Sequence, residues 1–159
     1  MKAIKITPKE FIDFEKANSR SSQFEWLFCL EPKFYRYRVS LTDFLQNKVY
    51  PTYRLNNSGA ALTGAYEDST ATPISFIELK ERPELLEAIL NEGYVSENDS
   101  VLVYRCERCG VTVVKDGIHR ISRWMIDNEK KELSIYEVVS TDWSKAIVDM
   151  PNFCKCATN

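Results

Sequence analysis

The sequence predicts a single α+β domain in which helices pack on a small mixed sheet. In the second half of the chain, segments with strand and helix periodicity follow in the order strand, helix, strand, strand, helix, strand. A length of 159 residues and a hydrophobic content of 44% suit one packed core and leave little room for a second. We therefore expect one domain over residues 1–159.

The elements of the second half follow from turn residues and periodicity. Pro83 suits the first turn of a helix, and Gly93 suits its end. The β-branched and aromatic content of other segments indicates strands. The predicted strands lie at residues 74–79, 101–105, 111–115 and 133–139, the middle two joined as a hairpin. The predicted helices lie at residues 83–93, 118–128 and 143–148.

The first half gives weaker signals. Thr7 followed by Glu10 is a capping-box pattern and predicts a helix. Residues 23–30 fit a buried strand or a helical turn equally well, because the run is too short for periodicity to decide. Residues 34–41 alternate at period two and predict a strand with one charged face. Residues 56–72 are small and polar, and we expect a long loop there.

Composition and charge exclude several classes of protein. No apolar run approaches the roughly 20 residues that cross a membrane, and the N-terminus lacks the apolar stretch of a secretory signal. We therefore expect a cytoplasmic location and no membrane partner. A net charge of −2 without a long basic block makes nucleic acid a less favoured partner. The five cysteines are an odd number, which fits reduced thiols better than disulfides.

The segment VVKDGIHRISRW places the only histidine of the chain between a predicted strand and a predicted helix. A turn at Asp116 and Gly117, with a helix opening near Ile118, aims backbone N–H groups, His119 and Arg120 at one point. Such a point suits an anion, and a phosphate above all.

Residues 74–139, with this turn in their middle, resemble the ParB/sulfiredoxin-like domain. The pieces are ISFIEL, PELLEAILNEGY, VLVYR with VTVV, KDGIHRISRW and LSIYEVV, and they follow in the family's order. The resemblance implies a ParB/sulfiredoxin-like core over residues 73–140. Residues 1–72 then form an N-terminal α/β extension with a polar loop, and residues 141–159 form a C-terminal helix and tail.

The resemblance also implies a nucleotide or a phosphorylated small molecule as ligand, such as a nucleoside triphosphate with magnesium. Gly117 would allow close backbone approach, while His119 and Arg120 would contact phosphate oxygens. Arg123 would extend this anion site, although an exposed helix face explains it as well. For a phosphotransferase acting on a small molecule or a protein, Asp116 and His119 are the candidate catalytic residues.

Departures from the family leave the activity open. Sulfiredoxins carry a reactive cysteine where this chain has Ile118, and the arginine-rich turn of partition proteins is absent. One alternative is a non-catalytic protein-binding module, such as an immunity protein or a phage or defence inhibitor, with a protein partner. A second alternative is a ParB-like nuclease, for which Arg36 and Arg38 would contact the nucleic acid.

The cysteines Cys106 and Cys109 form a C-x-x-C-G segment within the predicted hairpin. Two thiolates on a tight turn are typical of half a zinc site, and Cys154 and Cys156 would have to supply the other half. Ordinary reduced cysteines are the alternative. A redox pair is disfavoured because such a motif normally lies at the start of a helix.

Overall fold

The computed structural model describes residues 3–17, 31–46, 48–56, 58–63, 71–93, 98–141 and 143. Its strands are β1 (Ile4–Ile6), β2 (Lys33–Ser40), β3 (Val49–Tyr50), β4 (Arg54–Leu55), β5 (Leu62–Thr63), β6 (Thr72–Pro73), β7 (Ser100–Cys106), β8 (Thr112–Asp116) and β9 (Glu132–Ser140). Its helices are α1 (Pro8–Ala17), α3 (Leu41–Leu45), α4 (Phe76–Lys80), α5 (Pro83–Asn91) and α6 (Ile118–Ile126).

The main sheet is mixed and has the order β1-β2-β9-β7-β8-β3. Strands β2 and β9 are antiparallel over eight residue pairs, whereas β7 and β9 are parallel, with α6 following the β7–β8 hairpin. Three short strands form a second sheet in the order β5-β4-β6. A mixed sheet with packed helices confirms the predicted α+β class.

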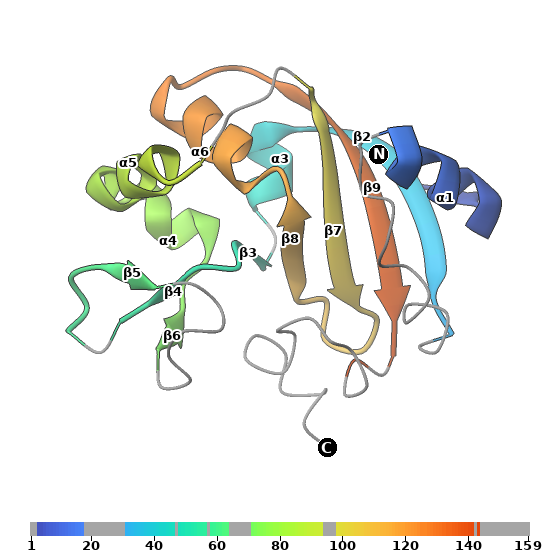
Figure 1. Ribbon diagram of the computed structural model, residues 1–159, viewed down its shortest axis with the longest axis horizontal. Coiled ribbons are helices and arrows are strands. Elements are labelled where there is room, and N and C mark those ends of the chain that lie inside the picture. Colours follow the sequence, from blue (N-terminus) through green and yellow to red (C-terminus); the bar gives the residue numbers. More distant parts are fainter. Residues whose placement is uncertain are drawn as a thin grey trace.

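Helices cover both faces of the main sheet (Figure 1). Helices α3 to α6 pack on one face, around buried residues such as Phe76, Ile89 and Ile121. Helix α1 packs on the opposite face, where Phe11 stacks on Phe34 at a centroid distance of 4.5 Å. Apolar side chains therefore alternate between two cores along the central strands, as the period of two requires.

The N-terminal strands belong to the main sheet. Strands β1 and β2 pair with each other, and β2 pairs along its whole length with β9. The predicted capping box is confirmed, because Thr7 Oγ1 accepts from Glu10 N at 3.1 Å and Glu10 Oε1 accepts from Thr7 N at 3.3 Å. The strand predicted over residues 34–41 is confirmed as β2.

The strand predicted over residues 74–79 is wrong. The chain forms α4 there, because Ser75 and Glu78 make a capping box in which each side chain accepts from the other's backbone N–H. Phe76 and Leu79, three residues apart, are both fully buried on one face of this short helix. Local hydrogen bonding thus outweighs the β-branched content of the segment.

The loop predicted over residues 56–72 is also partly wrong. Residues 62–63 form β5 and Thr72 begins β6, and both pair with β4 to build the small sheet. The period-based prediction failed because strands of two residues are too short to show periodicity.

Other predictions are confirmed, or lie outside the described residues. The helix at Pro83, the β7–β8 hairpin, the helix at Ile118 and the strand at residues 133–139 are all present. Residues 23–30 and 144–148 lie outside the described residues. Within the described part of the chain, none of the helices is both long and apolar enough to cross a membrane.

Candidate functional site

The turn between β8 and α6 depends on Gly117. This residue is the N-cap of α6 and has a φ of +112°, a conformation that glycine adopts without strain. A Cβ atom there would also lie 3.1 Å from Val101 Cγ2. No described side chain caps the first turn of α6. The turn therefore brings the chain close to β7 and leaves the helix start without a side-chain acceptor.

Arg120 is buried beneath this turn, with 5% of its surface exposed. Its Nη1 donates to the carbonyl oxygens of Asn98 at 2.5 Å and Ser100 at 2.6 Å. Its Nη2 donates to Asp116 Oδ2 at 2.9 Å. Because these bonds tie α6 and the end of β8 to the start of β7, Arg120 positions the turn. Its direct contact with a phosphate stays a prediction.

His119 points away from this buried network and packs against two segments that sequence reasoning did not assign to the site. Its Nε2 lies 3.5 Å from the Tyr53 hydroxyl, and the two rings meet edge to face at a centroid distance of 6.4 Å. A Cβ atom on Gly93 would lie only 2.2 Å from His119 Nε2. Gly93 thus provides the space that the imidazole occupies.

A cavity of about 290 Å³ shares Tyr53 with this contact, although His119 is not one of its lining residues. Tyr53 lines the cavity while its hydroxyl contacts His119, and Glu92, another lining residue, immediately precedes Gly93. The lining is mostly apolar, with two carboxylates. The lining residues are Tyr53, Ala60, Ala61, Leu62, Glu84, Leu85, Ala88, Ile89 and Glu92.

The remaining predicted site residues lie around the same turn. Asp116 keeps 38% of its side chain exposed while one oxygen accepts from Arg120. Arg123 is exposed and lies four residues after His119, on the same side of α6. The structure therefore gathers Asp116, His119 and Arg120 at one turn and places Arg123 one helical turn further along.

Tyr53 and Gly93 are the members of the site that sequence reasoning missed. Gly93 was noticed only as a helix stop, and its position shortly after a helix gives no sign of a contact with residue 119. Tyr53 lies in a segment without clear periodicity. Both contacts join residues far apart in the sequence, so a single sequence gave no signal for them.

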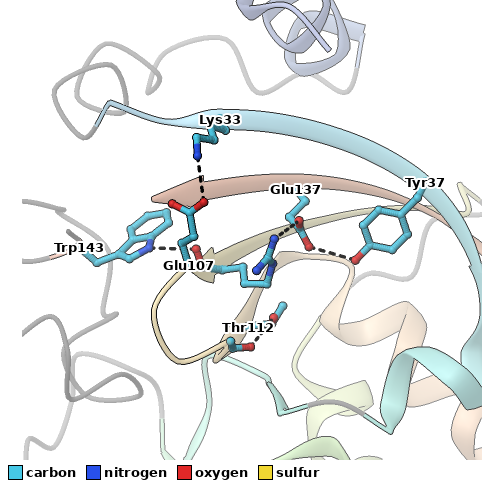
Figure 2. Close-up of polar contacts among 8 residues, drawn as sticks. Lys33, Tyr37, Glu107, Thr112, Glu137 and Trp143 are labelled. Carbon is cyan, nitrogen blue, oxygen red and sulfur yellow. Dashed lines mark hydrogen bonds and ion pairs between the residues drawn. The ribbon is translucent and has the colours of Figure 1, made fainter. Parts of the chain in front are cut away.

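A second polar cluster spans three neighbouring strands of the main sheet (Figure 2). Glu137 on β9 is 5% exposed and accepts from the Tyr37 hydroxyl at 3.1 Å and from Arg105 Nη2 at 3.1 Å. Burial and the nearby Glu137 carboxylate raise the pKa of Tyr37. Burial lowers the pKa of Arg105, but the hydrogen bond to Glu137 and the nearby charge of Glu137, with smaller contributions from Tyr37 and Glu107, together raise it above its usual value. Tyr37 therefore keeps its proton, which it donates to Glu137 Oε2.

Strand β2 carries Arg36 and Arg38, the arginines predicted to contact a nucleic acid, and Arg38 bonds to a neighbouring strand of the sheet. Arg38 Nε donates to Glu132 Oε1 at 2.7 Å, and its Nη1 donates to Ser134 Oγ at 3.0 Å. Arg36 is exposed. These contacts of Arg38 join β2 to β9, and contact of either arginine with a nucleic acid stays a prediction.

The predicted metal ligands are only partly described. Cys106 is buried and Cys109 is half-buried, while Cys154 and Cys156 lie outside the described residues. Within the described ranges, no three histidine, cysteine or acidic side chains gather to hold a metal ion.

Comparisons with known proteins give no relative for this chain: no family model, curated protein or solved structure matches it.

Proposed function

We propose that this chain binds a nucleotide, with the phosphates at the first turn of α6 and the base in the cavity beside Tyr53. The observation that carries the proposal is the junction of these two features. Tyr53 lines the cavity, and its hydroxyl lies 3.5 Å from Nε2 of His119 on that first turn. A ligand that fills the cavity thus reaches the helix start through this pair of side chains.

The first turn of α6 supports the phosphate part of the proposal. Helix N-termini present unpaired N–H groups and the positive end of the helix dipole. His119 adds a ring nitrogen, and the exposed Arg123 adds a fixed positive charge on the same side of the helix. Arg120 holds the turn rigid from beneath, which reduces the ordering that binding requires.

The charges of the cavity support the placement of the base. Glu84 and Glu92 repel phosphate oxygens, so the phosphates belong on the His119 side. The same carboxylates can accept hydrogen bonds from the amino groups of a nucleobase. The apolar remainder of the lining suits a flat ring, as in most small-molecule sites.

Phosphoryl transfer from a magnesium-bound nucleoside triphosphate to a small molecule or a protein is the reaction class that we assign to this site. Asp116 is the carboxylate nearest the turn, and its partial exposure leaves it accessible to a substrate hydroxyl. The order of α5, the β7–β8 hairpin, the turn, α6 and β9 supports the resemblance to ParB/sulfiredoxin-like domains.

Calorimetric titration with a panel of magnesium nucleoside triphosphates tests the proposal. We expect saturable binding of at least one nucleotide, weakened about tenfold or more in His119→Ala and in Ala88→Leu, which fills the cavity. Glu87→Leu is the matched control, because Glu87 lies on the same helix but does not line the cavity. Absence of binding by every nucleotide, or equal binding by Ala88→Leu and wild type, would overturn the proposal.

A second candidate function, binding of a protein partner, is supported by a separate groove between α3, α4 and α6. Leu41, Leu45, Trp124 and Met125 contribute apolar side chains to its lining, together with Ile77, which is 42% exposed, and polar side chains make up the rest. An exposed isoleucine surrounded by polar side chains is typical of a protein contact. Ile77→Asp should abolish such an interaction, and Ile4→Asp, at an even more exposed site on β1, should not.

A further inference from the structure

The two carboxylates that line the cavity beside Tyr53 lie at opposite ends of α5. Glu84 belongs to the first turn of this helix, and Glu92 follows its last residue. Because a helix rises about 1.5 Å per residue, the two residues are separated by about 12 Å along the helix axis. The two carboxylates can therefore contact different parts of one ligand.

Glu92 marks the end of the cavity that is nearer to His119. It immediately precedes Gly93, where an added Cβ atom would collide with the imidazole of His119. Tyr53 lines the same cavity, and its hydroxyl lies 3.5 Å from Nε2 of that imidazole. A ligand that extends from the cavity toward the first turn of α6 therefore passes Glu92.

The surface of α5 leaves room for a ligand between the two carboxylates. Glu84, Ala88 and Glu92 follow at intervals of four residues, so they lie along one side of the helix. Ala88 carries only a methyl group, and the buried Leu85 and Ile89 line the cavity beside it. A ligand can thus lie across Ala88 with one carboxylate at each end.

The two carboxylates differ in what they already bind. Glu84 Oε1 accepts from Arg82 Nε at 3.1 Å, and Arg82 Nη1 also donates to Gly59 O at 2.8 Å. Within the part of the chain that the structure describes, no hydrogen bond or ion pair engages the side chain of Glu92. An ionised carboxylate only accepts hydrogen bonds, and each of its oxygens can take one hydroxyl. Glu92 therefore offers two acceptors to a ligand with neighbouring hydroxyls.

We propose that Glu92 binds the ribose hydroxyls of the nucleotide and selects ribonucleotides over 2′-deoxyribonucleotides, an inference that rests on the proposed function. Ribose joins the base to the phosphates, and Glu92 lies between the interior of the cavity and His119, on the side assigned to the phosphates. In dinucleotide-binding folds, an acidic residue contacts the ribose 2′-hydroxyl in the same way. A 2′-deoxyribonucleotide would leave one oxygen of Glu92 without its donor.

Calorimetric titration with the magnesium complexes of ATP, GTP, CTP and UTP, each compared with its 2′-deoxy form, tests this selection. The wild type should bind at least one ribonucleotide about tenfold more tightly than the matching 2′-deoxyribonucleotide. A difference of this size is typical of one hydrogen bond to a charged group. The measured quantity is the ratio of the two dissociation constants.

Glu92→Ala should bring this ratio close to one. Glu84→Ala is the matched control, because it removes the other carboxylate of the same cavity and should keep the preference for ribose. Loss of a negative charge changes the affinity for both forms of a nucleotide alike, so the ratio isolates the hydroxyl contact. Circular dichroism checks that each variant is folded.

The outcomes separate this inference from the proposed function. Equal binding of ribonucleotides and 2′-deoxyribonucleotides by the wild type would overturn the role of Glu92 and leave the nucleotide site in place. A preference for ribose that persists in Glu92→Ala would do the same. Absence of binding by every nucleotide would overturn both the inference and the proposed function.

Discussion

Arg120 and His119 are neighbours in the sequence, yet the structure uses them differently. Arg120 turns inward and bonds to two carbonyl oxygens and one carboxylate, whereas His119 turns toward Tyr53, which lines the cavity. The sequence predicts that both residues contact one anion. In the structure, Arg120 positions the turn, and His119 is the candidate ligand contact. Two substitutions test this division.

Replacement of Arg120 by methionine should strongly destabilise the fold. The change leaves the carbonyl oxygens of Asn98 and Ser100 without their donor, and hydrogen bonds to charged groups contribute about 1.5–3 kcal/mol each. We expect a loss of about 3 kcal/mol in the free energy of unfolding, measured by urea denaturation. Arg123→Met, on the same helix but exposed, should cost under about 0.5 kcal/mol. Equal losses in both variants would contradict the positioning role.

Replacement of Gly93 by alanine should displace His119. The backbone of Gly93 lies outside the left-handed region, so the effect would come from the new Cβ atom meeting the imidazole. We expect a cost of about 1–3 kcal/mol and weaker nucleotide binding. In a His119→Ala background the same change should cost little, and a double-mutant cycle measures this coupling. A coupling energy near zero would show that the contact is unimportant.

At the scale of elements, local signals near helix ends were more informative than residue type. The capping box at Thr7 and the proline at position 83 each predicted the start of a helix correctly. The equivalent box at Ser75 was overlooked because the segment's isoleucines and phenylalanine favoured a strand. The small sheet could not be predicted, because its strands of two residues are defined by their partners and not by a pattern.

Removal of the Ser75 cap should weaken α4. Ser75→Ala removes the acceptor for Glu78 N and the hydrogen bond that Ser75 Oγ donates to Glu78 Oε1, and loss of an N-cap costs about 1 kcal/mol. The free energy of unfolding should fall by that amount. Thr42→Ala, at an exposed position of α3, should have an effect close to zero. If the two variants are equally stable, the cap does not determine the helix.

The hydrogen bond between Tyr37 on β2 and Glu137 on β9 should make the free energy of unfolding fall at alkaline pH. Burial, followed by the charge of Glu137, raises the pKa of Tyr37 in the folded chain above its unfolded value near 10. The unfolded chain therefore loses this proton first, and the contribution of Tyr37 to stability falls as the pH rises above 10. Relative to Tyr37→Phe, the wild type should lose about 1 kcal/mol between pH 9 and pH 11. Parallel stability curves for the two proteins would contradict this assignment.

At the scale of the whole molecule, the fold brings three distant segments to one place. Tyr53 precedes the small sheet, Gly93 follows α5, and His119 opens α6, so the candidate site exists only once α5 and α6 have packed together. The sequence predicted the turn itself, because Gly117, His119 and Arg120 lie within four consecutive residues there. It could not predict the cavity, whose walls come from Tyr53, from residues 60–62 at the start of β5, and from α5 with the residue that follows it.

The single histidine of the chain allows the most direct measurement of the central claim, that a nucleotide binds beside His119. Its ring protons give one unambiguous pair of nuclear magnetic resonance signals. Titration with magnesium nucleoside triphosphates should shift this pair saturably, and Ala88→Leu should suppress the shift by filling the cavity. If the His119 signals stay unchanged at millimolar concentrations of every nucleotide, the account of this site is wrong.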